Sequence, residues 1–371
     1  MSKPLAVGVI GCGTISGTYL KNMKASPLVR VVACADEVPE RARERAKEFG
    51  IARACSVEEL LADGDVELVV NLTIPAAHAP INLAALAAGK HVYTEKPFAT
   101  TREDGERILE AAAASGLTVG CAPDTVLGAG IQTCLRLLDS GKLGERLGGA
   151  GFALDFGPED WHPNPAFFFE PGAGPLFDVG PYYVTTLVYL LGPVRAVNGM
   201  GRILYTARTA ARGPRKGETF KVSVPTLITG LLEFESGAQA TLVASYGIGG
   251  TNLPNMQIYC TGGVLGVPDP NTFGGPVRVR DNERDAKWRD VPLLYRHTDS
   301  RGNFRGLGVI EAAQAIGEKR APRASGELGY HVLDVMQSIV ASAASGERVK
   351  VTSNFSVPPL LPDDATLAMA E

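Results

Sequence analysis

The residues that follow the first apolar run of the chain could hold a phosphate group. Gly11, Gly13, Thr14 and Ile15 form a glycine-rich turn between a strand-like run and a helical segment. Gly11 allows a tight turn, and Gly13 lets the backbone approach a pyrophosphate, which the free N–H groups of the following helix would bind. Ser16 replaces the third glycine of the dinucleotide-binding fingerprint and is small enough for close packing of helix on strand. An ordinary tight turn is the alternative.

An acidic residue stands where a dinucleotide-binding domain needs one. Asp36 ends the second apolar run, 23 residues beyond Gly13. An acid there accepts hydrogen bonds from the ribose hydroxyls of NAD and repels the 2′-phosphate of NADP. The alternative is a solvated cap for the helix that opens at Pro39. Because strand, turn, helix and strand follow in the expected order, we predict NAD as the cofactor, although Arg41 or Arg43 could weaken the preference over NADP.

Charged residues also follow the fourth apolar run, where a parallel sheet would bind its ligands. Glu95, Lys96 and Pro97 stand there, and a surface loop is the alternative for this tripeptide taken alone. Together with the glycine-rich turn and the string at residues 172–183, it resembles the Gfo/Idh/MocA oxidoreductases, which include glucose–fructose oxidoreductase and inositol dehydrogenase. The resemblance covers nearly the whole chain, and its motifs appear in the family's order.

The resemblance implies roles for three residues. Lys96 corresponds to the family lysine that contacts the reacting hydroxyl and takes part in proton transfer, and Asp178 corresponds to the aspartate that orients the substrate. Desolvation beside a bound nicotinamide would make Lys96 lose its proton more readily. The family usually has a histidine four residues after the aspartate, on the same face of one helix turn, whereas this sequence has Tyr182. Tyr182 either donates or relays a proton, or it lines the pocket while Lys96 acts alone.

The activity that the resemblance implies is oxidation of a secondary hydroxyl, with C3 as the expected position, of a sugar or polyol. A second enzyme class stays open: an NAD-dependent glycoside hydrolase, with sulfoquinovosidases as the suspected branch. Such an enzyme would oxidise C3, eliminate the aglycone, add water and return the hydride without net consumption of NAD. A cofactor sensor without chemistry is a third alternative, and the presence of both Lys96 and Asp178 argues against it.

Further candidate residues follow from the resemblance at the end of the third apolar run. Thr73, Pro75 and His78 are expected beside the cofactor, as is Glu95 with its neighbour Lys96. The alternative for His78 is capping of the helix N-terminus.

Three residues of the second half are candidate substrate ligands. Asp124 is either a substrate ligand or a helix cap. Trp161 and His162 belong to an aromatic, proline-rich loop that either binds the apolar faces of a sugar or packs on the second domain. A basic stretch that begins at Arg208 could meet an anionic group, but we expect a solvated hairpin there.

The elements that must position these residues fall into two parts. Strand-like runs alternate with helical segments in residues 1–123, which predicts an α/β Rossmann domain with a parallel sheet. Residues 124–371 predict an α+β domain for substrate binding and oligomerisation, with a mainly antiparallel open sheet. The expected strands of the first domain are Leu5–Ile10, Val29–Ala35, Val66–Leu72, His91–Thr94 and Leu117–Cys121. The main helices expected in the second are Ala129–Asp139, Leu176–Leu191 and Leu328–Ser345.

Composition excludes several classes of protein. The chain has 371 residues, of which 45% are hydrophobic and 20% charged, and its formal charge is -4. No long basic tract or long apolar run appears, so we expect neither a nucleic acid nor a membrane as a partner, and a cytoplasmic location. The six scattered cysteines and five histidines predict no metal site and no disulfide framework. The resemblance implies a homodimer or homotetramer formed through the open faces of the second-domain sheets.

Overall fold

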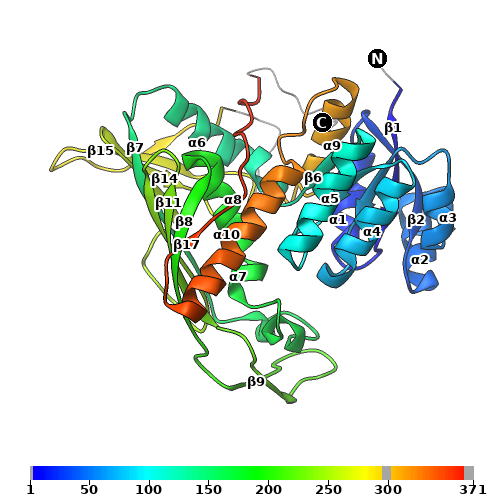
Figure 1. Ribbon diagram of the computed structural model, residues 1–371, viewed down its shortest axis with the longest axis horizontal. Helices are drawn as coiled ribbons and strands as arrows, with labels where there is room; N and C mark the ends of the chain where they lie inside the picture. The colour runs from blue at the N-terminus through cyan, green and yellow to red at the C-terminus, as the bar shows by residue number, and fades with distance from the viewer. Residues whose placement is uncertain (1–2, 295–301, 363–371) are drawn as a thin grey trace.

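The N-terminal part of the protein is a parallel sheet flanked by helices (Figure 1). The computed structural model describes residues 3–294 and 302–362. Within these ranges the sheet has six strands in the order β3-β2-β1-β4-β5-β6, which is the strand order of a dinucleotide-binding Rossmann domain. Its strands are β1 (Leu5–Ile10), β2 (Val29–Ala35), β3 (Arg53–Cys55), β4 (Leu68–Asn71), β5 (His91–Thr94) and β6 (Val119–Cys121). Its helices are α1 (Ser16–Lys24), α2 (Pro39–Phe49), α3 (Val57–Ala62), α4 (Pro75–Ala87) and α5 (Arg102–Ser115).

The predicted α/β architecture of this part is confirmed. The apolar runs form strands because both faces of a parallel sheet are covered by helices, and β1, β2 and β4 are almost wholly buried. Ser56 and Glu59 form the predicted capping box, in which each backbone N–H is bonded to the other side chain, at 2.8 and 3.1 Å. The short edge strand β3 was not predicted, because its three residues are too exposed to form an apolar run.

The C-terminal part contains a large, mostly antiparallel sheet, as predicted. In the described residues this sheet has nine strands in the order β16-β15-β14-β13-β7-β12-β11-β8-β17. One pair, β7 with β12, is parallel, so Asp155 and Tyr246 end these strands side by side. The strands are β7 (Arg146–Asp155), β8 (Val194–Arg202), β11 (Leu227–Phe234), β12 (Gln239–Tyr246), β13 (Met256–Cys260), β14 (Gly263–Val267), β15 (Val277–Asp281), β16 (Arg289–Val291) and β17 (Val349–Lys350).

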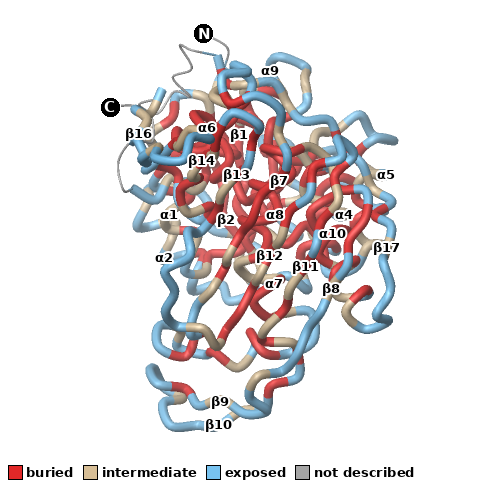
Figure 2. Tube along the Cα trace, turned by 90° about the vertical axis from the view of Figure 1, so that its left-hand side faces the viewer, coloured by how far each residue is buried: buried red, intermediate tan, exposed pale blue. Residues whose placement is uncertain are grey.

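In the part of the chain that the structure describes, helices cover one face of this sheet. Figure 1 shows α8 and α10 between the sheet and the N-terminal part, and their buried residues share one core with β11 and β12. Figure 2 shows the buried chain running through the middle of the molecule along β7, α8 and β12. A separate ribbon of β9 (Ala207–Thr209) and β10 (Thr219–Lys221) lies at the exposed lower end of this view. The helices of this part are α6 (Ala129–Asp139), α7 (Pro175–Asp178), α8 (Gly180–Leu191), α9 (Leu307–Gly317) and α10 (Gly326–Ser345).

The helix predicted at Leu176–Leu191 is wrong in one respect, because the structure breaks it at Val179. Pro181 has no N–H to donate to the preceding turn, and its ring clashes with a continuing helix. The chain therefore ends α7 at Asp178 and begins α8 at Gly180. Asp178 and Tyr182 consequently lie at the end of one helix and in the first turn of the next, and not on one helix turn as predicted.

The unpredicted helix α9 returns the chain to the Rossmann sheet. Its residues Val309 and Ile310 are fully buried in the core that contains Val7 and Val9 of β1. The proposed division at residue 123 thus leaves a segment of the second part inside the core of the first. Periodicity did not reveal α9 because it is apolar on most sides, as expected for a helix buried between two domains.

Asp124 holds the beginning of α9. It is 1% exposed, and its Oδ2 accepts hydrogen bonds from the N–H groups of Gly306 at 2.8 Å and Gly308 at 2.9 Å. Burial raises the pKa of Asp124 to about 6, although these two N–H groups and Arg305 oppose the increase. Asp124 therefore caps α9, which is distant in the sequence, and its role as a substrate ligand stays a prediction.

Several further features concern the chain as a whole. All six cysteines are unpaired. Among the residues that the structure describes, no three His, Cys, Asp or Glu side chains cluster so that they could hold a metal ion. No helix in the same residues combines the length and the apolar character that crossing a membrane requires.

The raised pKa of Asp124 predicts a pH-dependent contribution to stability. Because the pKa of Asp124 is higher in the folded than in the unfolded protein, its protonated form stabilises the fold. This contribution is complete below the unfolded-state pKa of 3.8 and is lost as pH rises through about 6. Asp124→Asn keeps an oxygen for Gly306 and Gly308 but does not titrate. We expect its free energy of unfolding, relative to wild type, to rise by about 2 kcal/mol between roughly pH 4 and pH 7.

Urea unfolding across this pH range measures the difference between wild type and variant. Asp285→Asn, at an exposed position, serves as the matched control and should follow wild type. Parallel curves for wild type and Asp124→Asn would show that Asp124 does not titrate in this window.

Candidate active site

A lysine and an aspartate from different parts of the chain meet beyond the end of β5. Lys96 follows β5 and Asp178 ends α7, and their side chains are 18% and 22% exposed. The Lys96 Nζ donates to the Asp178 carbonyl oxygen at 2.8 Å and to its Oδ1 at 3.0 Å. The structure thus brings together the two residues for which the resemblance implied chemistry, at the end of the sheet where parallel strands bind ligands.

Each member of this pair holds the other in its charged form. Burial by itself would lower the pKa of Lys96, but Asp178 and Glu95 raise that pKa above its usual value. Burial would raise the pKa of Asp178, but Lys96 and a hydrogen bond from Tyr246 hold it below its usual value. In the protein alone the adjacent carboxylate therefore outweighs desolvation at Lys96, and the readier loss of its proton beside a bound nicotinamide stays a prediction.

Two residues that the sequence did not single out complete this cluster. The Tyr246 hydroxyl donates to the Asp178 Oδ2, and Arg305 Nη2 donates to the Tyr182 hydroxyl at 3.0 Å. The Tyr182 ring lies between charged groups, with Lys96 Nζ and Arg305 Cζ each 5.4 Å from its centre. Tyr246 ends a strand and Arg305 precedes the unpredicted α9, so neither was marked by a motif.

Glu95 connects Lys96 to the cofactor-binding part of the sheet. Its Oε1 accepts the hydroxyl of Tyr19 from α1 at 2.8 Å, and its Oε2 accepts the Lys96 backbone N–H at 2.9 Å. Tyr19 is fully buried and Glu95 is 9% exposed. The Glu95 carboxylate therefore connects the backbone that leaves β5 to α1, the helix that follows the glycine-rich turn.

The glycine-rich turn has the shape that a dinucleotide requires. Gly11 has φ +98°, and a Cβ there would lie 2.6 Å from the Leu72 carbonyl carbon, whereas a Cβ on Gly13 would meet no atom within 4 Å. Thr14 is exposed and Ile15 half-buried at the start of α1. The turn is thus closed on its sheet side and open above Gly13, where a pyrophosphate would lie on the helix N-terminus.

Asp36 lies against this turn. Its Oδ2 accepts the Cys12 N–H at 2.7 Å and its Oδ1 accepts the Val38 N–H at 2.8 Å. Arg41 is 3.8 Å from the same carboxylate, and Arg43 pairs instead with Glu40. The carboxylate is therefore held at the carboxyl end of β2, beside the turn, where it can accept further hydrogen bonds from ribose hydroxyls.

His78 joins two loops at the same end of the sheet. It is fully buried, and its Nδ1 and Nε2 lie 2.7 and 3.1 Å from the carbonyl oxygens of Pro97 and Thr73. Burial lowers the pKa of His78. Both ring nitrogens face carbonyl groups, so His78 bridges the loops after β4 and β5. Pro75 begins α4, and neither ring nitrogen of His78 has the geometry of an N-terminal cap for this helix.

The aromatic loop is partly open to solvent. Trp161 is 58% exposed, and its ring lies edge-on to His162 with ring centres 5.5 Å apart. His162 also contacts Phe168 edge-on at 5.0 Å, and its charge contributes to lowering the pKa of Asp178. The loop therefore packs on its own aromatic residues and lies within electrostatic reach of the Lys96–Asp178 pair.

The predicted hairpin is present as β9 and β10, with Arg212 and Lys216 exposed between them, but the Arg208 side chain is not solvated, contrary to the prediction. Its side chain is 16% exposed and pairs with Glu159, and its Nη1 donates to the Tyr246 carbonyl oxygen at 2.7 Å. It also lies over the rings of Phe169 and Tyr205. The guanidinium is buried because five donors in a planar fork can bind several acceptors at once, so it fastens the β9 ribbon to the end of β12.

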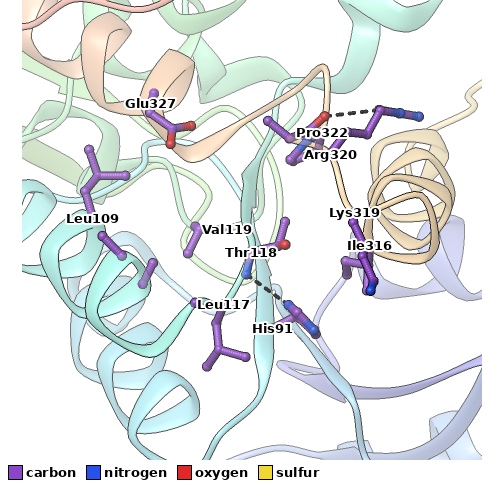
Figure 3. A pocket seen from close by; sticks show the side chains of 14 residues that line it. His91, Leu109, Leu117, Thr118, Val119, Ile316, Lys319, Arg320, Pro322 and Glu327 are labelled. Atoms are coloured by element: carbon purple, nitrogen blue, oxygen red, sulfur yellow. Dashed lines mark hydrogen bonds between the residues drawn. The ribbon is translucent and has the colours of Figure 1, made fainter.

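A separate cleft of about 480 Å³ lies away from these residues (Figure 3). His91, Thr118, Lys319 and Glu327 are among the residues that line it. His91 begins β5 and Thr118 precedes β6, so the cleft is at the amino ends of these strands. Parallel sheets bind their ligands at the opposite, carboxyl ends, and the cluster around Lys96 is therefore the candidate active site.

Comparison with known proteins agrees with this geometry. Residues 5–122 match the model of an oxidoreductase family with an NAD-binding Rossmann fold, and residues 131–266 match the Gfo/Idh/MocA C-terminal domain. The 1,5-anhydro-D-fructose reductase of Ensifer adhaerens is 26% identical over 94% of this chain and 99% of its own length. The levoglucosan dehydrogenase of Pseudarthrobacter phenanthrenivorans is 28% identical over 94% of this chain and 98% of its own.

Solved structures show the same fold. A levoglucosan dehydrogenase in complex with NADH and L-sorbose has a TM-score of 0.80 and 25% identity, over 94% of this chain and 99% of that one. An NAD-binding oxidoreductase from Klebsiella pneumoniae has a TM-score of 0.85 over 95% of this chain and all of its own, and at 22% identity it supports the fold alone. The matched models cover well over half of the sequence, and the chain therefore belongs to the Gfo/Idh/MocA oxidoreductase family, with NAD as the cofactor of its Rossmann domain.

Proposed function

We propose that this protein is an NAD-dependent dehydrogenase that oxidises a secondary hydroxyl, at C3, of a sugar or sugar-like polyol. The observation that supports this most directly is the buried Lys96–Asp178 pair beyond the end of β5. A lysine and a carboxylate there can bind a hydroxyl group, and the lysine can accept its proton when it is a neutral amine. The names of the aligned relatives, a reductase of an anhydrosugar and a dehydrogenase of levoglucosan, support a carbohydrate substrate.

The cofactor would be held by the residues around the glycine-rich turn. The backbone of Gly11, Gly13, Thr14 and Ile15 would bind the pyrophosphate, and Asp36 would bind the adenosine ribose. The nicotinamide end would lie near four residues at the carboxyl ends of β4 and β5: Thr73, Pro75, Glu95 and Lys96, with His78 holding the two loops together. When bound, NAD supplies the hydride acceptor of the reaction.

The protein's own groups would bind the substrate, and Lys96 would take the hydroxyl proton after losing its own, because only a neutral amine has a lone pair for it. The Lys96 Nζ has three hydrogens, and two of them are donated to Asp178, which leaves one for a substrate oxygen. Tyr182 adds a hydroxyl beside it. Trp161 and His162 would cover one face of the sugar. Asp124 is engaged by α9, so we propose a supporting role for it in place of direct binding.

The redox-neutral glycoside hydrolase remains the alternative use of this site, because it would need the same cofactor and the same lysine. No contact in the described residues favours it, and the relatives compared above are named as a reductase and a dehydrogenase. The two activities differ in net consumption of NAD, which makes them separable in one assay.

The test is a panel of free sugars, anhydrosugars, inositols and aryl glycosides incubated with NAD, in which NADH absorbance and aglycone release are followed together. We expect steady NADH formation from a free sugar or polyol. In Lys96→Met this rate should fall by about 10²- to 10⁴-fold because proton transfer is lost, while NADH still binds. Lys142→Met, at an exposed position, is the control. Repeated aglycone release without lasting NADH would establish the hydrolase instead.

Selectivity between NAD and NADP should depend on Asp36. Asp36→Asn keeps an oxygen for the Cys12 N–H but removes the charge that would repel a 2′-phosphate. We expect the ratio of kcat/KM for NAD to that for NADP to fall by roughly 10²-fold, since like charges in contact cost several kcal/mol. Glu37→Gln removes the exposed neighbouring acid and should leave the ratio within about 2-fold. An unchanged ratio in Asp36→Asn would place the ribose elsewhere.

The open face of the large sheet is the proposed contact between copies of the chain. Leu231 in β11 and Leu147 in β7 are 57% and 52% exposed, and Tyr259 in β13 is 38% exposed. Apolar side chains of this size on one sheet face are typical of an interface. We propose that two copies pack these faces together, in a homodimer or in half of a homotetramer.

Leu231→Asp tests this contact, because an unpaired charge buried in an interface is strongly unfavourable. We expect the variant to sediment as a smaller species than wild type at micromolar concentration, with an unchanged circular dichroism spectrum. Leu253→Asp changes an equally exposed leucine in a loop and should keep the wild-type mass. A wild-type protein that sediments as a monomer would overturn the proposal.

A further inference from the structure

Arg305 makes two contacts with the side chain of Tyr182. Its Nη2 donates to the tyrosine hydroxyl at 3.0 Å, and its Cζ lies 5.4 Å from the centre of the ring. Tyr182 is 7% exposed and stands in the first turn of α8, where the family usually has a histidine. The guanidinium therefore restrains both the position of the ring and the direction of its hydroxyl.

Arg305 is itself held from several sides. Its Nη1 donates to the Asn303 Oδ1 at 3.0 Å, and Asn271 accepts from its Nη2. The next residue, Gly306, is bonded to the buried Asp124. A chain of contacts thus runs from the cap of α9 through Arg305 to Tyr182, and it fixes a guanidinium that would otherwise have many rotamers.

The hydrogen-bonding capacity of the groups determines which way the tyrosine proton faces. A guanidinium and an ammonium have only donors, whereas a phenol has one donor and an acceptor oxygen. The Tyr182 oxygen must therefore accept from Arg305, and Lys96, 5.4 Å from the ring centre, offers no acceptor either. Neither cation can accept the tyrosine hydrogen, so that hydrogen remains for an acceptor other than Lys96 or Arg305.

We propose that Arg305 is a positioning residue that orients Tyr182 as a hydrogen-bond donor to the substrate oxygen held by Lys96. This inference rests on the proposed dehydrogenase function, since it needs a hydroxyl or carbonyl oxygen at that place. It decides between the two roles left open for Tyr182: the tyrosine contacts the reacting oxygen and does more than line the pocket. Arg305 acts only through Tyr182.

A double-mutant cycle tests the proposal. Arg305→Met, Tyr182→Phe and the double variant are compared with wild type on the best substrate of the panel. We expect each single change to lower kcat by about 10-fold, the value of one lost hydrogen bond to a charged or reacting group. The double variant should be within about 2-fold of Tyr182→Phe, because Arg305 has no further role once the hydroxyl is gone. The KM for NAD should not change.

Two further variants keep the result interpretable. Arg305→Lys retains a donor and should recover part of the lost kcat, but only when Tyr182 is present. Arg212→Met, at an exposed position, is the matched control and should behave as wild type. Losses that multiply in the double variant, or partial recovery by Arg305→Lys in the Tyr182→Phe background, would overturn the proposal.

Unfolding temperatures of the same variants separate failure of this inference from failure of the proposed function. If Arg305 and Tyr182 are in contact, their individual shifts are not additive in the double variant. Additive shifts would overturn the contact itself. If wild type reduces NAD with no compound of the panel, the proposed function fails, and donation to a substrate oxygen fails with it, whatever the unfolding cycle shows.

Discussion

The ion pair between Lys96 and Asp178 is the constraint on which the site depends, because it joins the end of a Rossmann strand to the helix break of the other domain. Two charges taken out of water are tolerated only when their geometry is good and their remaining hydrogen-bonding capacity is used. Tyr246 supplies a donor to the second oxygen of Asp178. The pair is consequently both a joint between domains and the group that can handle a substrate proton.

The elements around this pair position its two charged groups. Pro181 breaks the helix after Asp178, so that the aspartate lies at a helix end and its carbonyl oxygen is available to Lys96. Arg208 connects the β9 ribbon to the end of β12, because it donates a hydrogen bond to the carbonyl oxygen of Tyr246. In both arrangements, a carbonyl oxygen at the end of a helix or strand accepts a hydrogen bond from a buried charged side chain.

The cofactor half and the substrate half of the protein are linked through buried polar contacts. Glu95 connects Tyr19, in the helix behind the glycine-rich turn, to the backbone of Lys96. On the other side, Asp124 caps α9 and so fixes the backbone that carries Arg305. In the proposed reaction the hydride acceptor, Lys96 and the substrate oxygen must lie within contact distance, and these links would fix that distance through the fold.

Much of the fold and part of the site could be read from local patterns in the chain. Apolar runs, helix caps and the glycine-rich turn depend on neighbours within a few residues, and for that reason the Rossmann strands and an NAD-binding turn could be predicted. Lys96 and Asp178 were identified through the family resemblance, and the preference for NAD at Asp36 stays a prediction. The break at Val179 has a local signal, Pro181, that the sequence prediction overlooked, but the helix α9 and the partners Tyr246 and Arg305 could not be predicted. They depend on contacts between segments more than 60 residues apart in the chain, and only tertiary packing brings such segments together.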